Sequence, residues 1–481
     1  MLLFKYLYIL LFLLWITSSQ STPESVEITD LPDQTQKIYQ GWLCVSEKDQ
    51  SYLYYQLFLA DKAKDPSKLP LLLFLEGGPG DSSLQTVWAD FGPYRIDSNL
   101  NFTGPNDPSA IRFTLHKRTT TWSNGSYNLL SIDNPTLTGF SYSKTKTIIN
   151  DTIGAGAHLI NFLTRFYEIY NNLATSPLYV IGHSYGGHYA PYLVYTLVKD
   201  YNKILGKIKV NLGGVIGLNP YVSLGRQTGY PSYFFASSLT DPNKRDYLEK
   251  IDYQIIQNIR SKKPNEAVQK FLEELRHITN SFPGILITPN ATIDNVRRSH
   301  LLTNPDSEEL ARHYLSPKYF FNTAIEGVNS AKKMFNIPDD ISFLNGYVEQ
   351  SFIDSGDFGM DFAYTIEYLL EQGVDVTLLS AQDDGVIPVP GVSKLVTSLK
   401  WTGDEDYKKA ERKPWRASNG TVVGNYKKQK NFNYVILYKA GHVATFDQPE
   451  ALMNFLYRVT SNIWNEKGFE ESDGSRKAIK F

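Results

Sequence analysis

The hydrophobic positions of the chain form short apolar runs, and longer amphipathic segments separate several of them. Residues 70–76 are apolar almost without interruption, which is typical of a strand buried on both faces. Residues 154–169 carry apolar side chains at helical spacing and predict a helix. Strands that alternate with helices along the chain imply a mostly parallel sheet with right-handed crossovers. Further strands are predicted at residues 38–43, 52–59, 127–133, 178–181, 213–220, 375–382 and 433–439, the first two as an antiparallel pair.

One long region departs from this alternation. Between residues 221 and 345 the apolar strands stop, and residues 268–278 have the spacing of an amphipathic helix among more charged segments. A helical insertion between core strands would form a cap over a site at the sheet edge, although an insertion without a role at the site remains the alternative. We therefore predict a core of residues 22–220 and 346–464, a helical cap at 221–345 and a polar tail at 465–481.

The N-terminus has the pattern of a secretory signal peptide. Residues 1–21 contain one lysine, a short apolar core and small polar residues. The apolar run is shorter than the roughly 20 residues that span a bilayer, so we predict no membrane span after its removal, with an uncleaved anchor as the alternative. The expected destination is the extracellular space or a lysosome or vacuole. Five sequons are candidate glycosylation sites: Asn101, Asn124, Asn150, Asn290 and Asn419.

Composition narrows the classes of function. The formal net charge is −2 over 481 residues, and no basic patch indicates a nucleic-acid partner. The glycine-rich loop at residues 77–83 lacks the Lys-Ser/Thr pair of a phosphate-binding loop, so we predict neither a nucleotide cofactor nor a metal. Cys44 is the only cysteine, which excludes an internal disulfide, and its place in a predicted strand favours a buried structural thiol. The composition does not indicate an oligomeric state.

The chemically most informative stretch is Gly182-His-Ser-Tyr-Gly186, a G-x-S-x-G motif. The predicted strand 178–181 precedes it, and the amphipathic segment 189–198 follows it. A strand, a tight turn and a helix in this order hold a serine hydroxyl on a strained elbow above the sheet, with a helix N-terminus behind it. Ser184 is therefore the predicted nucleophile, and a simple glycine-rich turn is the alternative that the motif alone leaves open.

A serine nucleophile in this setting needs a carboxylate and then a histidine later in the chain. Asp383 and Asp384 follow the predicted strand 375–382, and His442 follows the last predicted strand. His442 would take the serine proton while an aspartate fixes its tautomer, and the pattern does not choose between the two aspartates. Of the other histidines, His183 and His188 flank the nucleophile too closely for the usual base geometry, and the rest lack a position at the end of a strand. We therefore predict an α/β-hydrolase fold, with a mostly parallel central sheet and helices on both faces.

These residues resemble the serine carboxypeptidases, which are α/β-hydrolase exopeptidases of secretory and vacuolar compartments. The resemblance covers most of the chain, and several long motifs occur in the order typical of the family, which is far more specific than G-x-S-x-G alone. The segments that carry it are residues 70–84, 91–94, 133–135, 139–142, 182–191, 380–389, 440–442 and 447–449.

Carried over position by position, the resemblance implies roles for individual residues. It makes Ser184, Asp384 and His442 the catalytic triad, and it favours Asp384 because Val-Ile-Pro follows at the family's spacing. It implies that the backbone N–H groups of Gly78 and Tyr185 form the oxyanion hole, in agreement with the rule that one donor follows the nucleophile.

The resemblance also implies substrate-binding positions at Glu76, Gly77, Asp90, His183 and Val443, and the chain departs from the family at all of them except Gly77. Glu76 replaces an asparagine before Gly77, Asp90 replaces a glutamate, His183 replaces the glutamate before the nucleophile, and Val443 replaces a common methionine. In the family, the first three positions hold the terminal carboxylate of the substrate at acid pH. An ionised Glu76 would repel that carboxylate unless a protonated His183 offsets its charge or Glu76 itself takes a proton.

Three functions follow from these observations. The first is a serine-type carboxypeptidase that releases C-terminal residues from peptide substrates through an acyl-enzyme on Ser184. The altered residues Glu76 and His183 motivate the second, the same chemistry as an esterase or acyltransferase. The third is a non-catalytic binding or protective protein on a hydrolase scaffold, which the complete triad disfavours.

Overall fold

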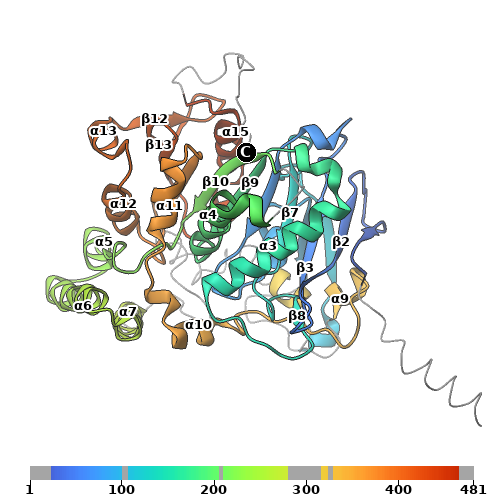
Figure 1. Cartoon of the computed structure of the whole chain (residues 1–481), viewed down its shortest axis with the longest axis horizontal. Coiled ribbons are helices and arrows are strands. Elements are labelled where there is room, and N and C mark those ends of the chain that lie inside the picture. Colours follow the sequence, from blue (N-terminus) through green and yellow to red (C-terminus); the bar gives the residue numbers. More distant parts are fainter. Residues whose placement is uncertain (1–22, 100–106, 205–209, 280–315, 323–328, 465–481) are drawn as a thin grey trace, which may run out of the picture.

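The molecule is organised around one large central sheet, seen in the computed structural model of residues 23–99, 107–204, 210–279, 316–322 and 329–464 (Figure 1). The predicted signal peptide, the polar tail, residues 280–315 and 323–328 of the predicted cap, and the sequons at Asn101 and Asn290 lie outside these residues. The strands are β1 (Val26–Ile28), β2 (Ile38–Ser46), β3 (Ser51–Phe58), β4 (Leu71–Leu75), β7 (Asn128–Ile132), β8 (Tyr142–Ser143), β9 (Leu178–His183), β10 (Leu212–Leu218), β11 (Val376–Ala381), β12 (Lys413–Arg416), β13 (Val422–Gln429) and β14 (Phe432–Leu437).

The order of the strands confirms a mostly parallel centre with antiparallel flanks. It runs β1-β2-β3-β7-β4-β9-β10-β11-β14-β13-β12, and β8 pairs with β3. The strands from β7 to β14 in this order are parallel, whereas β1 to β3 and β12 to β13 add to them in antiparallel fashion. A separate two-stranded sheet pairs β5 (Tyr94–Ser98) with β6 (Phe113–Lys117).

Both faces of the sheet are buried, and this explains why its central strands are continuously apolar. In β4, Leu71, Leu73 and Leu75 belong to one hydrophobic cluster, and Leu72 and Phe74 belong to the cluster on the opposite face. All five side chains are at most 1% exposed. Successive residues of a strand point to opposite faces, so a strand between two layers of helices needs apolar residues at every position.

Helices supply the two layers (Figure 1). α3 (Thr152–Ile169) and α4 (Gly186–Ile204) pack together on one face, and α15 (Pro449–Ser461) contributes to the cluster on the other. The side chain of Asp151 caps α3 by accepting the N–H of Gly154 at 2.6 Å. The remaining α-helices are α2 (Ser83–Thr86), α5 (Tyr230–Ala236), α6 (Pro242–Arg260), α7 (Pro264–Thr279), α9 (Ser330–Met334), α10 (Glu349–Ser355), α11 (Ala363–Glu371), α12 (Val389–Ser398), α13 (Asp404–Lys409) and α14 (Ala444–Asp447).

Short helical turns connect several of these elements: the π-turn η2 (Val87–Phe91) and the 3₁₀ turns η1 (Pro66–Lys68), η3 (Pro108–Ala110), η4 (Asn171–Thr175) and η7 (Asp357–Gly359). Between β10 and β11, the helices α5, α6 and α7 pack on one another beside the sheet (Figure 1). The assignment of residues 221–345 as a cap over the site stays a prediction.

The interpretation of Cys44 needs a correction. Cys44 is a free thiol in β2, as expected of a lone cysteine in a strand, but its side chain is only half-buried. The neighbouring Leu43 and Val45 are fully buried, because they belong to the cluster beneath α3. Burial and the nearby Glu47 raise the pKa of the Cys44 thiol, which disfavours the nucleophilic thiolate.

Candidate active site

Ser184 lies on a sharp turn between β9 and α4, at the carboxyl end of a central strand. Its φ of +55° is in the left-handed region, where a residue with a Cβ is strained. The turn is held by the N–H of Ser184 on the carbonyl of Leu218 at 3.1 Å, and by the N–H of Tyr221 on the carbonyl of Ser184 at 2.8 Å. A Cβ on Gly182 would lie 2.0 Å from the carbonyl oxygen of Gly186, so only glycine allows the close approach.

The two predicted acid–base partners meet at the same edge of the sheet. β11 and β14 are parallel neighbours, and Asp384 and His442 follow their carboxyl ends. The Nδ1 of His442 lies 2.9 Å from Oδ2 of Asp384. The second oxygen of this buried carboxylate, Oδ1, accepts the N–H groups of Val386 and Ile387, both at 2.8 Å. With Nδ1 engaged, Nε2 of His442 is the nitrogen available for proton transfer.

Asp383, the other candidate, is linked to the histidine loop through its backbone. Its backbone N–H donates to the carbonyl of Ala440 at 2.8 Å, and this bond helps to hold the loop that carries His442. The structure therefore brings the carboxylate of Asp384 to Nδ1 of His442, whereas this bond from Asp383 to the histidine loop runs through its backbone.

Asn219 is a further residue at this edge, and the sequence reasoning missed it. It follows β10 and is fully buried. Its amide donates to the carbonyls of Gly441 at 3.1 Å and His442 at 2.7 Å, while its oxygen accepts the N–H of Ala381 at 2.7 Å. Asn219 therefore ties together the ends of β10, β11 and the histidine loop. The only signal in the sequence was a polar residue directly after an apolar strand.

The glycine-rich loop after β4 packs directly against the nucleophile. A Cβ on Gly77 would lie 2.5 Å from the amide nitrogen of Tyr185 and 2.8 Å from Cβ of Ser184. Gly78 has a φ of +100°. Within the described residues, no hydrogen-bond acceptor is paired with the N–H of Gly78 or of Tyr185. Two unpaired backbone donors beside a serine have the chemistry of an oxyanion hole.

Asp133 joins the glycine-rich loop at residues 77–83 to other segments of the chain through hydrogen bonds to its carboxylate. Its Oδ1 accepts the Ser82 hydroxyl at 2.7 Å and the Leu84 N–H at 3.0 Å, and its Oδ2 accepts the Phe140 N–H at 3.1 Å. Burial raises the pKa of Asp133 to about 6, while these donors act in the opposite direction. Asp133 thus anchors the start of α2 and the loop that leads into it from Gly77 and Gly78.

A second buried network lies behind the nucleophile. The Tyr185 hydroxyl and the Thr152 hydroxyl both donate to Oδ2 of Asp357, the latter at 2.6 Å, and Nδ1 of His188 lies 3.6 Å from the same oxygen. Burial raises the pKa of Asp357, but the hydrogen bond and charge of His188 outweigh it and the pKa is lowered overall. The network fixes the ring of Tyr185, whose N–H is one of the two unpaired donors. The sequence analysis did not single out Asp357 or Thr152.

The predicted substrate-binding residues Glu76 and His183 form a buried pair. Oε1 of Glu76 lies 2.6 Å from Nδ1 of His183 and also accepts the N–H of Gly77 at 2.9 Å. Nε2 of His183 lies 2.8 Å from the backbone carbonyl of His442. The pair therefore lies between the glycine-rich loop and the histidine loop.

Asp90 and Val443 lie on the elements that flank this pair. Asp90 lies on η2, and its Oδ2 accepts the Thr445 hydroxyl at 2.8 Å. Burial raises the pKa of Asp90 to about 7, although the bond from Thr445 lowers it. Val443 is half-buried at the start of α14, directly after His442.

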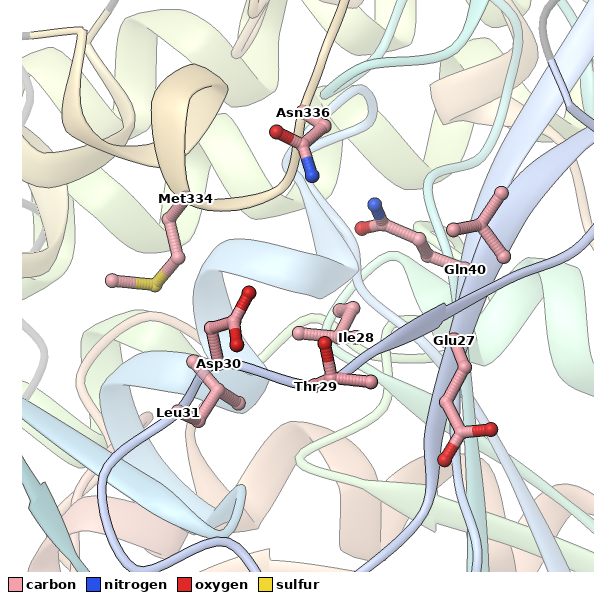
Figure 2. A pocket seen from close by; sticks show the side chains of 9 residues that line it. Glu27, Ile28, Thr29, Asp30, Leu31, Gln40, Met334 and Asn336 are labelled. Atoms are coloured by element: carbon pink, nitrogen blue, oxygen red, sulfur yellow. The ribbon is translucent and has the colours of Figure 1, made fainter.

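Other parts of the described structure lie apart from these residues. A small pocket opens beside β1, with Ile28, Gln40 and Met334 among its walls, and none of the predicted catalytic residues lines it (Figure 2). No group of three or more His, Cys, Asp or Glu side chains in the described ranges is arranged to hold a metal ion. Among the helices that the structure describes, none is both long and apolar enough to cross a membrane.

Comparison with known proteins identifies the family of this chain. The sequence model of the serine carboxypeptidases matches residues 29–462, which is most of its length. The chain belongs to the serine carboxypeptidase family. It is therefore a serine-type carboxypeptidase, and the resemblance found in the sequence is confirmed.

Relatives of this serine carboxypeptidase occur in insects, fungi and humans. The venom serine carboxypeptidase of Apis mellifera is 29% identical over 82% of this chain and 78% of its own length. The pheromone-processing carboxypeptidase kex1 of Aspergillus fumigatus is 27% identical over 84% of this chain, and the match spans only 63% of kex1. The probable serine carboxypeptidase CPVL of Homo sapiens is 26% identical over 80% of this chain and 75% of its own length.

The solved structures confirm the fold of the carboxypeptidase. Kex1ΔP, a prohormone-processing carboxypeptidase from Saccharomyces cerevisiae, superposes with a TM-score of 0.71 and covers 91% of this chain and 95% of its own. The identity is 18%, so this likeness speaks for the architecture alone. The predicted α/β-hydrolase fold is thereby confirmed.

Proposed function

We propose that this carboxypeptidase releases C-terminal residues from peptides through an acyl-enzyme on Ser184, with His442 as general base and acid and Asp384 as its orienting carboxylate. The observation that carries the proposal is the 2.9 Å contact between Nδ1 of His442 and Oδ2 of Asp384. It occurs at the sheet edge where Ser184 occupies its strained turn, and the parallel strands β9, β11 and β14 bring all three residues there.

The reaction follows from these positions. Oγ of Ser184 attacks the scissile carbonyl while Nε2 of His442 takes its proton, and the resulting imidazolium is stabilised by Asp384. The negative oxygen of the tetrahedral intermediate accepts the N–H groups of Gly78 and Tyr185. His442 then protonates the leaving amine, the acyl-enzyme forms, and water activated by His442 releases the shortened peptide.

The proposed oxyanion hole predicts the effect of Gly77→Ala. The new Cβ would lie 2.5 Å from the amide nitrogen of Tyr185, so the two proposed donors must separate. We expect kcat to fall by about 10²-fold or more, which is the usual cost of losing one oxyanion donor. Gly373→Ala is the control, because its Cβ meets nothing within 4 Å, and it should lower stability through its φ of +77° without lowering kcat. Equal kcat values for the two variants would contradict an oxyanion hole formed by Gly78 and Tyr185.

The proposed activity itself is tested with N-blocked dipeptides. Steady release of the C-terminal residue from a substrate with a free carboxylate, followed by mass spectrometry across pH, supports a carboxypeptidase. Cleavage of only the matching ester or amide would overturn the assignment to peptide C-termini and leave the triad intact. A digest of a longer peptide that yields internal fragments would contradict exopeptidase action.

The route of the protein through the cell is a further part of the proposal. We infer entry into the secretory pathway through residues 1–21, with the extracellular space or a lysosome or vacuole as the destination. Three sequons lie within the described residues, and their asparagines, Asn124, Asn150 and Asn419, are all exposed, as glycan attachment requires.

A further inference from the structure

His183 connects the two loops that carry the proposed catalytic groups. Its Nδ1 lies 2.6 Å from Oε1 of Glu76, which leads into the oxyanion loop. Its Nε2 lies 2.8 Å from the backbone carbonyl of His442. The rings of His183 and His442 are close neighbours, with centroids 4.8 Å apart. His183 and Glu76 are both buried, so water does not compete well for these bonds.

The hydrogen-bond partners of His183 favour its protonated, positively charged form. A backbone carbonyl only accepts, so Nε2 carries a proton. Oε1 of Glu76 already accepts the Gly77 N–H, and an ionised carboxylate likewise needs a donor at Nδ1. Burial alone lowers the pKa of His183, but the charge and hydrogen bond of Glu76 raise it to about 9. Burial raises the pKa of Glu76, and His183 lowers it overall. Both observations favour an imidazolium–carboxylate pair.

We propose that His183 is a positioning residue, an imidazolium that Glu76 holds in place and that fixes the backbone of His442 against the oxyanion loop. The inference rests on the proposed role of His442 as the base. Asn219 donates to the same carbonyl from the other side, at 2.7 Å, so two buried donors hold one peptide group. These two donors restrain the loop that carries the His442 imidazole.

This role differs from recognition of the substrate carboxylate. Both N–H groups of His183 are used within the protein, and Glu76 offers only acceptors. A terminal carboxylate therefore finds no free donor on the pair. Loss of His183 should consequently reduce kcat, whereas loss of a substrate-binding donor would mainly raise KM.

Several charged or titratable groups act on His183, and Glu76 is the dominant partner. Asp384 raises the pKa of His183 further. Asp90 titrates near 7, below the range in which His183 loses its proton. The groups that face His183 are Glu76 at the end of β4, Asp81 in the following loop, Asp90 on η2, Asp384 after β11 and His442 after β14.

Glu76→Gln tests the proposal through the pH profile. In the wild type, kcat should stay high up to about pH 9 and fall as His183 loses its proton. Glutamine preserves the shape but removes the charge, so burial dominates and the alkaline fall should move down by at least about one pH unit. The rate of Ser184 phosphonylation by an organophosphonate should show the same shift, which removes any dependence on peptide binding.

His183→Gln provides the second variant. A neutral amide cannot donate to both acceptors from two separate nitrogens, so kcat should fall by about 10²-fold with KM near the wild-type value, and the fall near pH 9 should disappear. His116→Gln is the matched control: His116 also pairs with a carboxylate, Asp97, at 3.4 Å, but it is 52% exposed. This control should leave the entire profile unchanged.

The outcomes separate this inference from the proposed function. Nitrogen-15 NMR of labelled histidine should show His183 protonated at both nitrogens at pH 8, whether or not the enzyme cleaves a given peptide. A neutral His183 at that pH, or a His183→Gln variant that changes KM alone, overturns the positioning role. Absence of peptide cleavage with a normal rate of phosphonylation contradicts the peptidase assignment and leaves the positioning role standing.

The pH dependence of protein stability tests the ion pair between His183 and Glu76 independently of catalysis. The pKa of His183 rises from its ordinary value of 6.5 to about 9 in the folded protein. The stabilising contribution is therefore fully present below about pH 6.5 and is lost as pH rises through about 9. The difference in urea midpoint between wild type and His183→Gln should shrink over that interval, and a constant difference would contradict the ion pair.

Discussion

Ser184→Ala should lower kcat for a blocked dipeptide by about 10⁶-fold, with KM close to the wild-type value. The substitution removes only the hydroxyl that attacks the carbonyl and leaves the binding surface in place. Alanine also has a Cβ, so the strain at a φ of +55° is nearly the same in both proteins, and the turn should be retained. Stopped assays with long incubation, together with titration by an organophosphonate, measure the loss.

The control for this prediction is Ser83→Ala. Ser83 is a buried serine near the site, and its hydroxyl accepts the N–H of Glu76 at 2.9 Å. Loss of the Ser83 hydroxyl should lower the free energy of unfolding by about 1 kcal/mol. Phosphonate labelling of Ser184 should remain stoichiometric. Labelling of Ser184→Ala with the same stoichiometry as wild type would show that another residue is the nucleophile.

The central strands and the nucleophile turn could be predicted from the sequence because the patterns that identify them lie within short stretches of the chain. Strands buried on both faces are continuously apolar, as β4 is, and the G-x-S-x-G turn carries its steric requirement in Gly182 itself. Edge strands lack such signals. The edge strand β12 and its neighbour β13 carry several charged or polar residues and were missed, because most of their side chains are exposed or only half-buried.

The parts of the site that the sequence did not predict depend on contacts between distant residues. Asn219 and Asp357 are single polar residues without a motif, and their partners lie on other elements. Glu76 and His183 were recognised as departures from the family, yet their mutual contact across 107 positions was only a hypothesis. In the structure, the acid at one position and the base at the other compensate each other, so neither substitution is interpretable alone.

The choice between Asp383 and Asp384 shows the same limit and gives the second large prediction. Asp384→Asn should lower kcat by about 10⁴-fold. Its Oδ1 accepts two backbone N–H groups, so the amide oxygen should remain there and the amide nitrogen should face Nδ1 of His442. Nδ1 must then accept a hydrogen bond, which places the proton on Nε2 and leaves no base toward Ser184. Steady-state kinetics against the same dipeptide measure the effect.

Asp383→Asn is the matched control, because it makes the same change of one carboxylate to an amide one residue earlier. The backbone N–H of Asp383 donates to the carbonyl of Ala440 in the histidine loop, and the substitution preserves that bond. Its kcat should stay close to the wild-type value. If Asp383→Asn lost activity and Asp384→Asn kept it, the carboxylate assignment would be reversed, and the 2.9 Å contact between Asp384 and His442 would have no catalytic role. Because the two variants carry equal charge and differ in position alone, their comparison isolates the orientation of His442 from the electrostatics of the loop.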